Sequence, residues 1–327
     1  MKTIVKILAA GLVTGSALSA VTVMAQDYPN QPVTIVVPFA AGGPTDTVTR
    51  LVAAAMSEDL GQQVVVQNVG GAGGTLGAGQ VAAAANDGYT LLLHHIGMST
   101  APALYASLPY DPMTDFAPIG LVTEVPMTIV ARKDFEPATL EDLIAHVKEN
   151  GEDITYANAG IGAASQLCGL LFMDALDTKM TEVPYQGTGP AMTDLLGGQI
   201  DMMCDQTTNT TSQILAGEIK AYAVTTSSRI AVLPDVPTMA EGGVENFELG
   251  IWHGLYAPAG TDQAIIDRLA ASLQKALTSE TVGTSFAELG TYPVQASEAT
   301  PAALAQKLEG QIGLWAEVIA AAGVSAQ

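Results

Sequence analysis

A short sequence occurs twice in this chain, and each copy stands where a strand pattern gives way to a helix pattern. The first copy is residues 37–44 (VPFAAGGP), and the second, 146 positions later, is residues 183–190 (VPYQGTGP). In both copies, glycines allow backbone angles that other residues avoid. The closing proline suits the first turn of a helix, where its missing N–H costs nothing. We therefore predict two strand-loop-helix units of the same design.

The start of a helix favours bound anions. Its first backbone N–H groups have no partner within the helix, and the helix dipole adds partial positive charge there. Two such starts that face each other across a cleft would hold one acidic molecule between them. The repeat therefore predicts an anion site made of backbone groups.

Strand and helix patterns alternate from residue 26 onward, which predicts an α/β fold. Strands are expected at 33–37, 64–66, 90–93, 119–123, 128–131, 154–157, 181–184, 200–204 and 221–225. Helices are expected at 44–60, from the glycine-rich turn to 85, and at 140–148, 163–176, 190–196, 262–277 and 301–322.

A break between two of these strands, at residues 124–126, is a candidate crossing between two lobes. We expect domain 1 to comprise residues 26–124 and 247–327, and domain 2 to comprise residues 125–246. Two lobes of similar design would place the repeated loops on opposite walls of a cleft, beyond the carboxyl ends of strands.

The first 25 residues are typical of a secretory signal peptide. Lys2 and Lys6 precede an apolar stretch, and the segment ends in the small-residue pattern Val23-Met24-Ala25. The alternative is a membrane anchor, but glycine, serine and threonine residues dilute the apolar run. We expect an exported, periplasmic protein that is cleaved near Ala25.

Charge excludes nucleic acid as a partner. The chain carries 12 basic and 33 acidic residues; without the two leader lysines, 10 − 33 leaves a net charge of −23. This excess repels an anionic ligand at long range. An anion site must therefore use short-range, fixed donors such as backbone amides.

The two cysteines, Cys168 and Cys204, are compatible with two states. In an oxidising compartment they would form a disulfide, and otherwise they would be buried thiols. We favour the disulfide. No histidine stands in an obvious partner context, so a catalytic cysteine is not expected.

Motifs for other chemistry fail on spacing. The glycine-rich segment 70–77 lacks the Gly-x-Gly-x-x-Gly spacing of a dinucleotide site, and no phosphate-binding loop, zinc motif or Gly-x-Ser-x-Gly element occurs. His94 and His95 are neighbours in a predicted strand, so we expect their side chains to point to opposite faces, with one of them near the cleft. We expect no cofactor, no metal site and no enzymatic machinery.

Several single residues are candidates for ligand contact, each with a structural alternative. Ser165 follows a third strand-to-helix turn, where it would face the ligand or merely cap a helix. Asp46 lies in a first turn, where a carboxylate also complements the dipole. Asp205 ends a strand and would orient a water molecule or accept from a ligand amine. Phe39 and Tyr185 are equivalent in the repeat and would either cap the cleft or pack beneath the loop.

At these residues the chain resembles the Bug family, the periplasmic solute-binding proteins of tripartite tricarboxylate transporters. The matching segments are 37–46 (VPFAAGGPTD), 68–74, 110–118, 184–191 and 233–238. The resemblance covers nearly all of the mature chain. It implies a two-lobed, Venus-flytrap (type II-like) binding protein with a hinge, which delivers a carboxylate to membrane transporter subunits.

The resemblance implies ligand-binding residues in the loops at 39–46, around Gly160 and Ser165, and at 185–189, and Asp205 is added to the candidate set from its place at a strand end. The candidate set is Phe39, Ala40, Ala41, Gly42, Gly43, Thr45, Asp46, Ala159, Gly160, Ser165, Tyr185, Gly187, Thr188, Gly189 and Asp205. The segment 204–211 (CDQTTNTT) is similar to a subgroup associated with amino-dicarboxylates such as aspartate.

We therefore expect a monomeric receptor for a di- or tricarboxylate or an acidic amino acid. A sensor that presents its ligand to a membrane signalling protein is the alternative. An exported hydrolase would need a nucleophile and base in the cleft.

Overall fold

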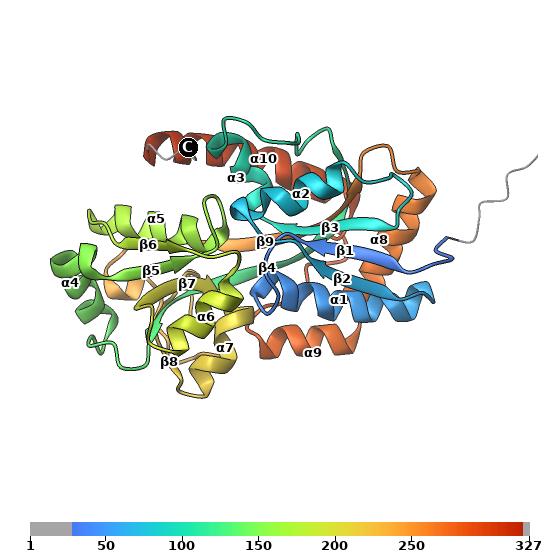
Figure 1. Cartoon of the computed structure of the whole chain (residues 1–327). Helices are drawn as coiled ribbons and strands as arrows, with labels where there is room; N and C mark the ends of the chain where they lie inside the picture. The colour runs from blue at the N-terminus through green and yellow to red at the C-terminus, as the bar shows by residue number, and fades with distance from the viewer. Residues whose placement is uncertain (1–27, 323–327) are drawn as a thin grey trace, which may run out of the picture.

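The computed structural model describes residues 28–322, so the predicted signal peptide at 1–25 lies outside the described residues. In this part of the chain, nine strands form one mixed sheet with the order β2-β1-β3-β9-β4-β7-β5-β6, and β8 pairs with β4 (Figure 1). The strands are β1 (Val33–Val37), β2 (Val64–Asn68), β3 (Thr90–His95), β4 (Phe116–Arg132), β5 (Thr155–Asn158), β6 (Thr181–Pro184), β7 (Met202–Gln206), β8 (Ile219–Val224) and β9 (Gly250–Pro258).

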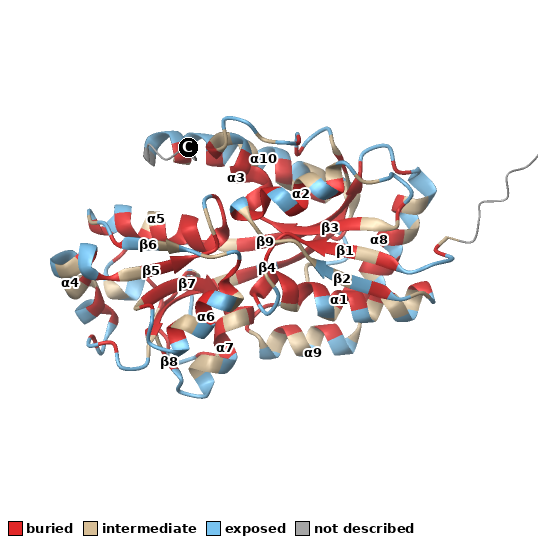
Figure 2. Ribbon diagram, viewed as in Figure 1, coloured by how far each residue is buried: buried red, intermediate tan, exposed pale blue. Residues whose placement is uncertain are grey.

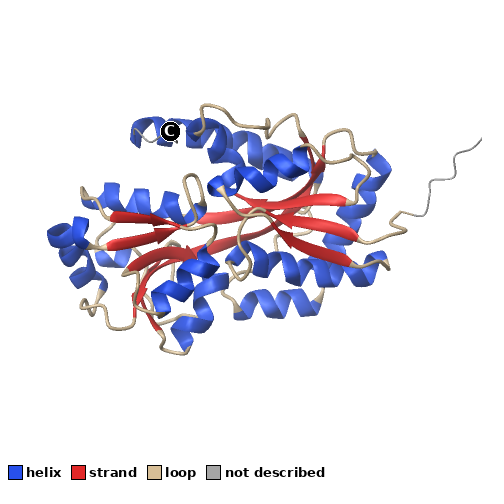
Figure 3. Ribbon diagram, in the orientation of Figure 1, coloured by secondary structure: helices blue, strands red, loops and turns tan. Residues whose placement is uncertain are grey.

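Helices cover both faces of this sheet (Figure 3). They are α1 (Pro44–Leu60), α2 (Thr75–Ala82), α3 (Gly97–Leu104), α4 (Leu140–Asn150), α5 (Ala164–Leu176), α6 (Thr188–Leu196), α7 (Thr207–Leu215), α8 (Gln263–Leu277), α9 (Glu280–Glu288) and α10 (Pro301–Ala322). Short 3-10 turns lie at η1 (Ala72–Gly74), η2 (Gly151–Asp153) and η3 (Ala240–Gly242). The α/β prediction is confirmed. Among the described residues, no helix is both long and apolar enough to span a membrane.

The long strand β4 joins two lobes. Its first part, from Phe116 to Pro126, pairs with β9, and its last part, from Met127 to Arg132, pairs with β7 and β8. We call β1, β2, β3, β9 and the first part of β4 the first lobe, and β5 to β8 with the rest of β4 the second lobe. The division of the chain at residues 124 and 246 remains a prediction, and the change of pairing partner lies beside its first boundary.

The expected break at 124–126 is wrong, because β4 continues through it. Pro126 keeps an extended backbone that suits a strand, and its missing N–H falls where β4 exchanges one neighbour for another. The chain crosses back to the first lobe between β8 and β9, and Thr225 in this segment is hydrogen-bonded to residues at both crossings. Its N–H donates to the carbonyl of Met127 (2.9 Å), and its hydroxyl accepts from the N–H of Met127 (3.0 Å) and donates to the carbonyl of Leu249 (2.6 Å).

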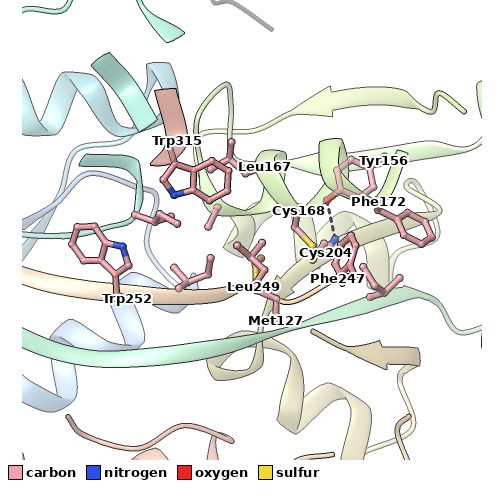
Figure 4. Close-up of a cluster of buried hydrophobic side chains, with 14 of the residues drawn as sticks. Met127, Tyr156, Leu167, Cys168, Phe172, Cys204, Phe247, Leu249, Trp252 and Trp315 are labelled. Carbon is pink, nitrogen blue, oxygen red and sulfur yellow. Dashed lines mark hydrogen bonds between the residues drawn. A yellow bond between two sulfur atoms is a disulfide. The ribbon is translucent and has the colours of Figure 1, made fainter. Parts of the chain in front are cut away.

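The apolar core runs from one lobe into the other (Figure 2). One cluster of buried side chains includes Trp252 of β9 and Trp315 of α10 together with Met127 and Leu167 (Figure 4). A second cluster lies on the opposite side of the first lobe, among β1, α1 and α8. The lobes are therefore connected by a continuous buried core as well as by the two segments at which the chain crosses between them.

The disulfide lies within the second lobe. Cys168 of α5 is bonded to Cys204 of β7, and their Cα atoms are 6.0 Å apart (Figure 4). Beside it, the hydroxyl of Tyr156 donates to the carbonyl of Ser165 (2.5 Å) and accepts from the N–H of Cys204 (3.2 Å). These links hold the first two turns of α5 against the sheet.

Candidate functional site

A small cavity lies between the two lobes, where the first turns of four helices meet. The empty space in it is about 290 Å³, part of which is open to solvent. It is lined by Phe39, Gly43, Pro44, Thr45, His95, Ala159, Ala164, Ser165, Thr188, Asp205 and Gln206. These residues place the starts of α1, α5, α6 and α7 around one space.

None of these four helices has a side-chain cap within residues 28–322. Helices α2 and α3, which do not line the cavity, also lack a side-chain cap within these residues, whereas α4, α8 and α9 are capped by Thr139, Asp262 and Ser279. A side-chain cap normally satisfies one of the free N–H groups of the first turn. The four cavity helices therefore leave amide donors and the positive ends of their dipoles for a ligand.

Seven of the predicted site residues line the cavity. They are Phe39, Gly43, Thr45, Ala159, Ser165, Thr188 and Asp205. Ser165 accepts a hydrogen bond from the N–H of Ala159 (2.9 Å), which leaves the proton of its hydroxyl free to point elsewhere. The candidate set from the sequence lacked four lining residues, Pro44, His95, Ala164 and Gln206, although one of His94 and His95 was expected near the cleft. His95 and Gln206 end strands β3 and β7, and the position of a residue at a strand end is the signal that would have found them.

Other predicted residues lie at the seam where the lobes touch. The N–H of Ala40 donates to the carbonyl of Gln186 across the seam (2.8 Å). A Cβ added to Gly187 would lie 2.8 Å from the nitrogen of Ala40, and one added to Gly160 would lie 3.0 Å from the nitrogen of Gly73. These glycines therefore let two backbones approach each other and do not line the cavity.

Ala41, Gly42 and Gly189 line a separate, more open groove at the outer edge of the seam. Tyr185 also lies outside the cavity. Its hydroxyl donates to Asp194 (2.7 Å), and its ring packs against the core of the second lobe. Of the two equivalent aromatic residues, Phe39 thus lines the cavity and Tyr185 packs beneath its loop.

Asp46 is used within the first loop and does not line the cavity. Its carboxylate accepts from the N–H of Gly42 (2.9 Å), from Arg50 (2.9 Å) and from Asn68 (2.9 Å). Burial works to raise the pKa of Asp46, but the hydrogen bonds from Arg50, Gly42 and Asn68 outweigh it and hold the pKa below its usual value. Asp46 therefore fastens the loop that carries Gly43 and Thr45.

Asp205 is the buried acid of the cavity. Burial raises its pKa from 3.8 to about 6, although hydrogen bonds from Asn209 (2.6 Å), the backbone of Gln206 and the hydroxyl of Thr188 oppose the shift. Beside it, the side-chain oxygen of Gln206 is buried and has no hydrogen-bond partner among the described residues. This end of the cavity therefore offers oxygen acceptors.

Asp205→Asn is expected to stabilise the unliganded protein at neutral pH. A carboxyl whose folded pKa exceeds its unfolded pKa costs nothing below about pH 4 and destabilises the folded state increasingly as the pH rises through about 6. The full shift corresponds to about 3 kcal/mol. Urea denaturation should show the variant more stable than wild type at pH 7.5 and equal to it near pH 3.5. Asp235→Asn, at an exposed position, is the control; equal stabilities at every pH would contradict the shift.

His95 lies at the cavity, as was expected of one of the two neighbouring histidines, but the orientation of their rings differs from the prediction. The ring centroids of His94 and His95 are 5.0 Å apart, so the rings lie side by side and do not point to opposite faces. The reason is local: β3 ends at His95, and the N–H of His95 donates to Nδ1 of His94, which folds that ring back (2.8 Å). Within residues 28–322, no group of three or more His, Cys, Asp or Glu side chains is placed to hold a metal ion.

Comparison with known proteins gives a consistent result. The family model described as "Tripartite tricarboxylate transporter family receptor" matches residues 48–323. A protein of Agrobacterium vitis, known by its position in the TAR-I ttuE-ttuC' intergenic region, is 58% identical over 312 residues, which is 95% of this chain and 90% of the relative.

Two solved structures share this fold. The periplasmic binding protein BugD is 53% identical, with a TM-score of 0.90 over 92% of this chain and 100% of its own. MatC of Rhodopseudomonas palustris, solved with bound malate, is 42% identical, with a TM-score of 0.86 over 89% of this chain and 100% of its own.

Proposed function

The chain belongs to the family of tripartite tricarboxylate transporter receptors, and from this premise we propose that it captures a small carboxylate between its lobes and delivers it to a membrane transporter. Members of this family are periplasmic binding receptors and not enzymes. The proposal includes export, with cleavage of the leader near Ala25, and action as a monomer. Co-purification of transporter subunits with the mature protein tests delivery.

The convergence of four uncapped helix starts on one cavity carries this proposal. Hydrogen bonds to a charged group contribute about 1.5 to 3 kcal/mol each, and a micromolar Kd requires about 8 kcal/mol net. About five such bonds would suffice after the cost of ordering the ligand. Backbone donors also agree with the net charge of −21, which offers no long-range attraction to an anion.

Closure of the lobes explains how binding would be signalled. The lobes are joined across the seam by direct hydrogen bonds: Thr100 donates to the carbonyl of Gly162 (2.9 Å), and Tyr105 donates to that of Ile161 (2.9 Å). A ligand that touches both walls stabilises this closed arrangement by its differential affinity. A membrane partner can then recognise the closed shape.

The ligand itself is expected among small dicarboxylates and acidic amino acids. The structural neighbour MatC was solved with malate, which is a four-carbon acid. The buried carboxylate of Asp205 would receive the ammonium group of an acidic amino acid.

A thermal-shift screen followed by calorimetry tests the proposal. The mature, ligand-stripped protein is exposed to succinate, malate, aspartate, glutamate, citrate and adipate. Glucose is the uncharged control, and asparagine is the control that matches aspartate but lacks its second carboxylate. A ligand at a hundred times its Kd adds about 2.7 kcal/mol of stability, which raises the Tm visibly. A Tm that rises only with the sugar and with none of the acids would contradict the proposal.

The pH dependence of Kd distinguishes ligands that carry an ammonium group from ligands that do not. The ammonium group of aspartate would pair with ionised Asp205, so affinity for aspartate should fall as the pH drops from 7.5 through about 6. Succinate has no such group, and protonation of Asp205 would remove a like charge, so its affinity should rise over the same interval. Calorimetry at both pH values measures this. Identical slopes for both acids would mean that Asp205 does not face the ligand.

A further inference from the structure

Three buried histidines lie together in the first lobe, and one of them, His95, lines the cavity. His95 pairs with His253 of the neighbouring strand β9, and their ring centroids are 5.9 Å apart. The ring of His95 also stacks on Phe39 (4.6 Å between centroids). Burial lowers the pKa of His94 and His253 to about 3 and the pKa of His95 well below its usual value, so all three are neutral at physiological pH.

The hydrogen-bond partners determine which nitrogen of each neutral ring carries the proton. Nδ1 of His253 lies 3.1 Å from the carbonyl oxygen of Ile251, which can only accept, so Nδ1 carries the proton. Nε2 of His253 is then an acceptor. The hydroxyl of Thr45, 3.3 Å from this atom, must donate to it.

His95 has the opposite tautomer. The backbone N–H of Gly97 donates to its Nδ1 (3.0 Å), so the proton is on Nε2. This Nε2–H has no hydrogen-bond partner within the described part of the chain, while the residue lines the cavity and is only 3% exposed. His95 therefore offers a donor that the protein itself does not use.

These assignments place one hydrogen-bond acceptor and one hydrogen-bond donor on the first-lobe wall of the cavity. The proton of Thr45 is committed to His253, so its oxygen presents only lone pairs to the cavity. Next to it, His95 presents an N–H. A ligand that carries a hydroxyl or ammonium donor close to a carboxylate would match both groups.

We propose that His95 contacts the ligand as a neutral donor to a carboxylate oxygen, and that His253 is a positioning residue that turns the Thr45 hydroxyl into an acceptor. Together they would select carboxylates that bear a neighbouring hydroxyl or amino group over those that bear only methylene groups. This inference rests on the proposed function for its ligand, but the histidine tautomers can be tested without one.

The first test is nitrogen-15 NMR of the imidazole rings in the unliganded protein, assigned with single histidine variants. His253 should show the proton on Nδ1, while His94 and His95 show it on Nε2. Thr45→Val should move the Nε2 signal of His253 and leave that of His94 unchanged. A His253 ring with its proton on Nε2, or a charged ring, would overturn the positioning role.

The second test is calorimetry with malate and succinate, which differ only in one hydroxyl. Wild type should prefer malate about tenfold. Thr45→Val and His253→Phe should each remove this preference, and the double variant should lose no more than either single one, because the two residues act on the same contact. Additive losses would contradict the positioning role. If His253→Phe does not fold, Thr45→Val alone still tests whether this contact sets the preference for malate.

His95→Phe tests the proposed hydrogen bond from His95 to the ligand. The phenyl ring can still stack on Phe39 but has no N–H, so both acids should bind about tenfold more weakly, with their ratio preserved. His146→Phe, in α4 away from the cavity, is the control and should change neither affinity. Unchanged affinity in His95→Phe would overturn the contact. If wild type binds neither acid, the proposed function fails for four-carbon acids, whereas the NMR result still decides the tautomers.

Discussion

Gly189→Ala is expected to weaken ligand binding about 100-fold while leaving the unliganded protein folded. Gly189 lies in the first turn of α6, where alanine is at least as favourable to the helix as glycine. Its added Cβ, however, would lie 2.6 Å from the oxygen of Ala41, 2.9 Å from the carbonyl carbon of Gly42 and 3.0 Å from the nitrogen of Gly43. All three atoms are backbone of the first lobe, so they cannot move aside as a side chain would.

The clash exists only when the lobes are closed, so it acts on closure and not on folding. Overpacking of this kind costs up to about 3 kcal/mol, which is about 100-fold in Kd. Calorimetry with the best ligand of the screen measures the affinity, and the Tm of the unliganded protein reports the fold. An unchanged Kd with a normal Tm would mean that ligand binding does not require the closed seam.

Gly283→Ala is the matched control for this experiment. Gly283 lies within helix α9, and among the described residues nothing lies within 4 Å of a Cβ added there. Replacement of a helical glycine by alanine stabilises a helix by about 0.5 to 1 kcal/mol. The control should therefore raise the Tm slightly and leave the Kd unchanged.

Removal of the disulfide is expected to give the largest loss of stability. Cys168 and Cys204 are separated by 36 positions, and closure of a loop of that length lowers the entropy of the unfolded chain by an amount worth about 4 kcal/mol. The double variant Cys168→Ala/Cys204→Ala should lower the free energy of unfolding by about this amount in urea denaturation.

A reducing agent supplies the control, because it should destabilise wild type and leave the double variant unchanged. The variant should also bind ligand more weakly. Its lost link anchors α5, whose first turn places Ala164 and Ser165 at the cavity. A loss below about 1 kcal/mol would show that the loop between the cysteines is already ordered in the unfolded chain.

Much of the fold could be predicted from local pattern. Strands 33–37 and 181–184 and helices 44–60 and 301–322 have the predicted bounds. The start of α1 has a clear signal, with proline at its first position, and its end is marked by Gly61 in the left-handed conformation (φ 69°). The resemblance to the Bug family is also confirmed.

Tertiary contacts explain what local pattern missed. Helix α7 is rich in threonine, which has low helix propensity, and it forms because Thr207, Thr210 and Thr211 are buried against neighbouring elements. Helix α3 contains Pro102, which argues against a helix when only the sequence is considered. Helix α9 was missed as well, although Ser279 caps its start.

The site could be predicted as a set of loops but not as a set of contacts. Gly43 and Gly189 stand at equivalent places in the repeat, yet Gly43 lines the cavity and Gly189 lies at the outer groove. The difference depends on how the lobes meet, which no local pattern contains. Which of His94 and His95 reaches the cavity was likewise not predictable, because it follows from the turn after β3 and from the neighbouring strand β9.

Backbone amide NMR of the mature protein, titrated with its best carboxylate ligand, examines most directly whether helix starts bind the acid. We predict that the amide protons of Thr45, Ser165 and Thr188 shift downfield on saturation, because each would donate to a carboxylate oxygen. Amides in the capped first turns of α4 and α8 should stay in place. If only amides outside the cavity shift and these three do not, the four helix starts are not the binding site.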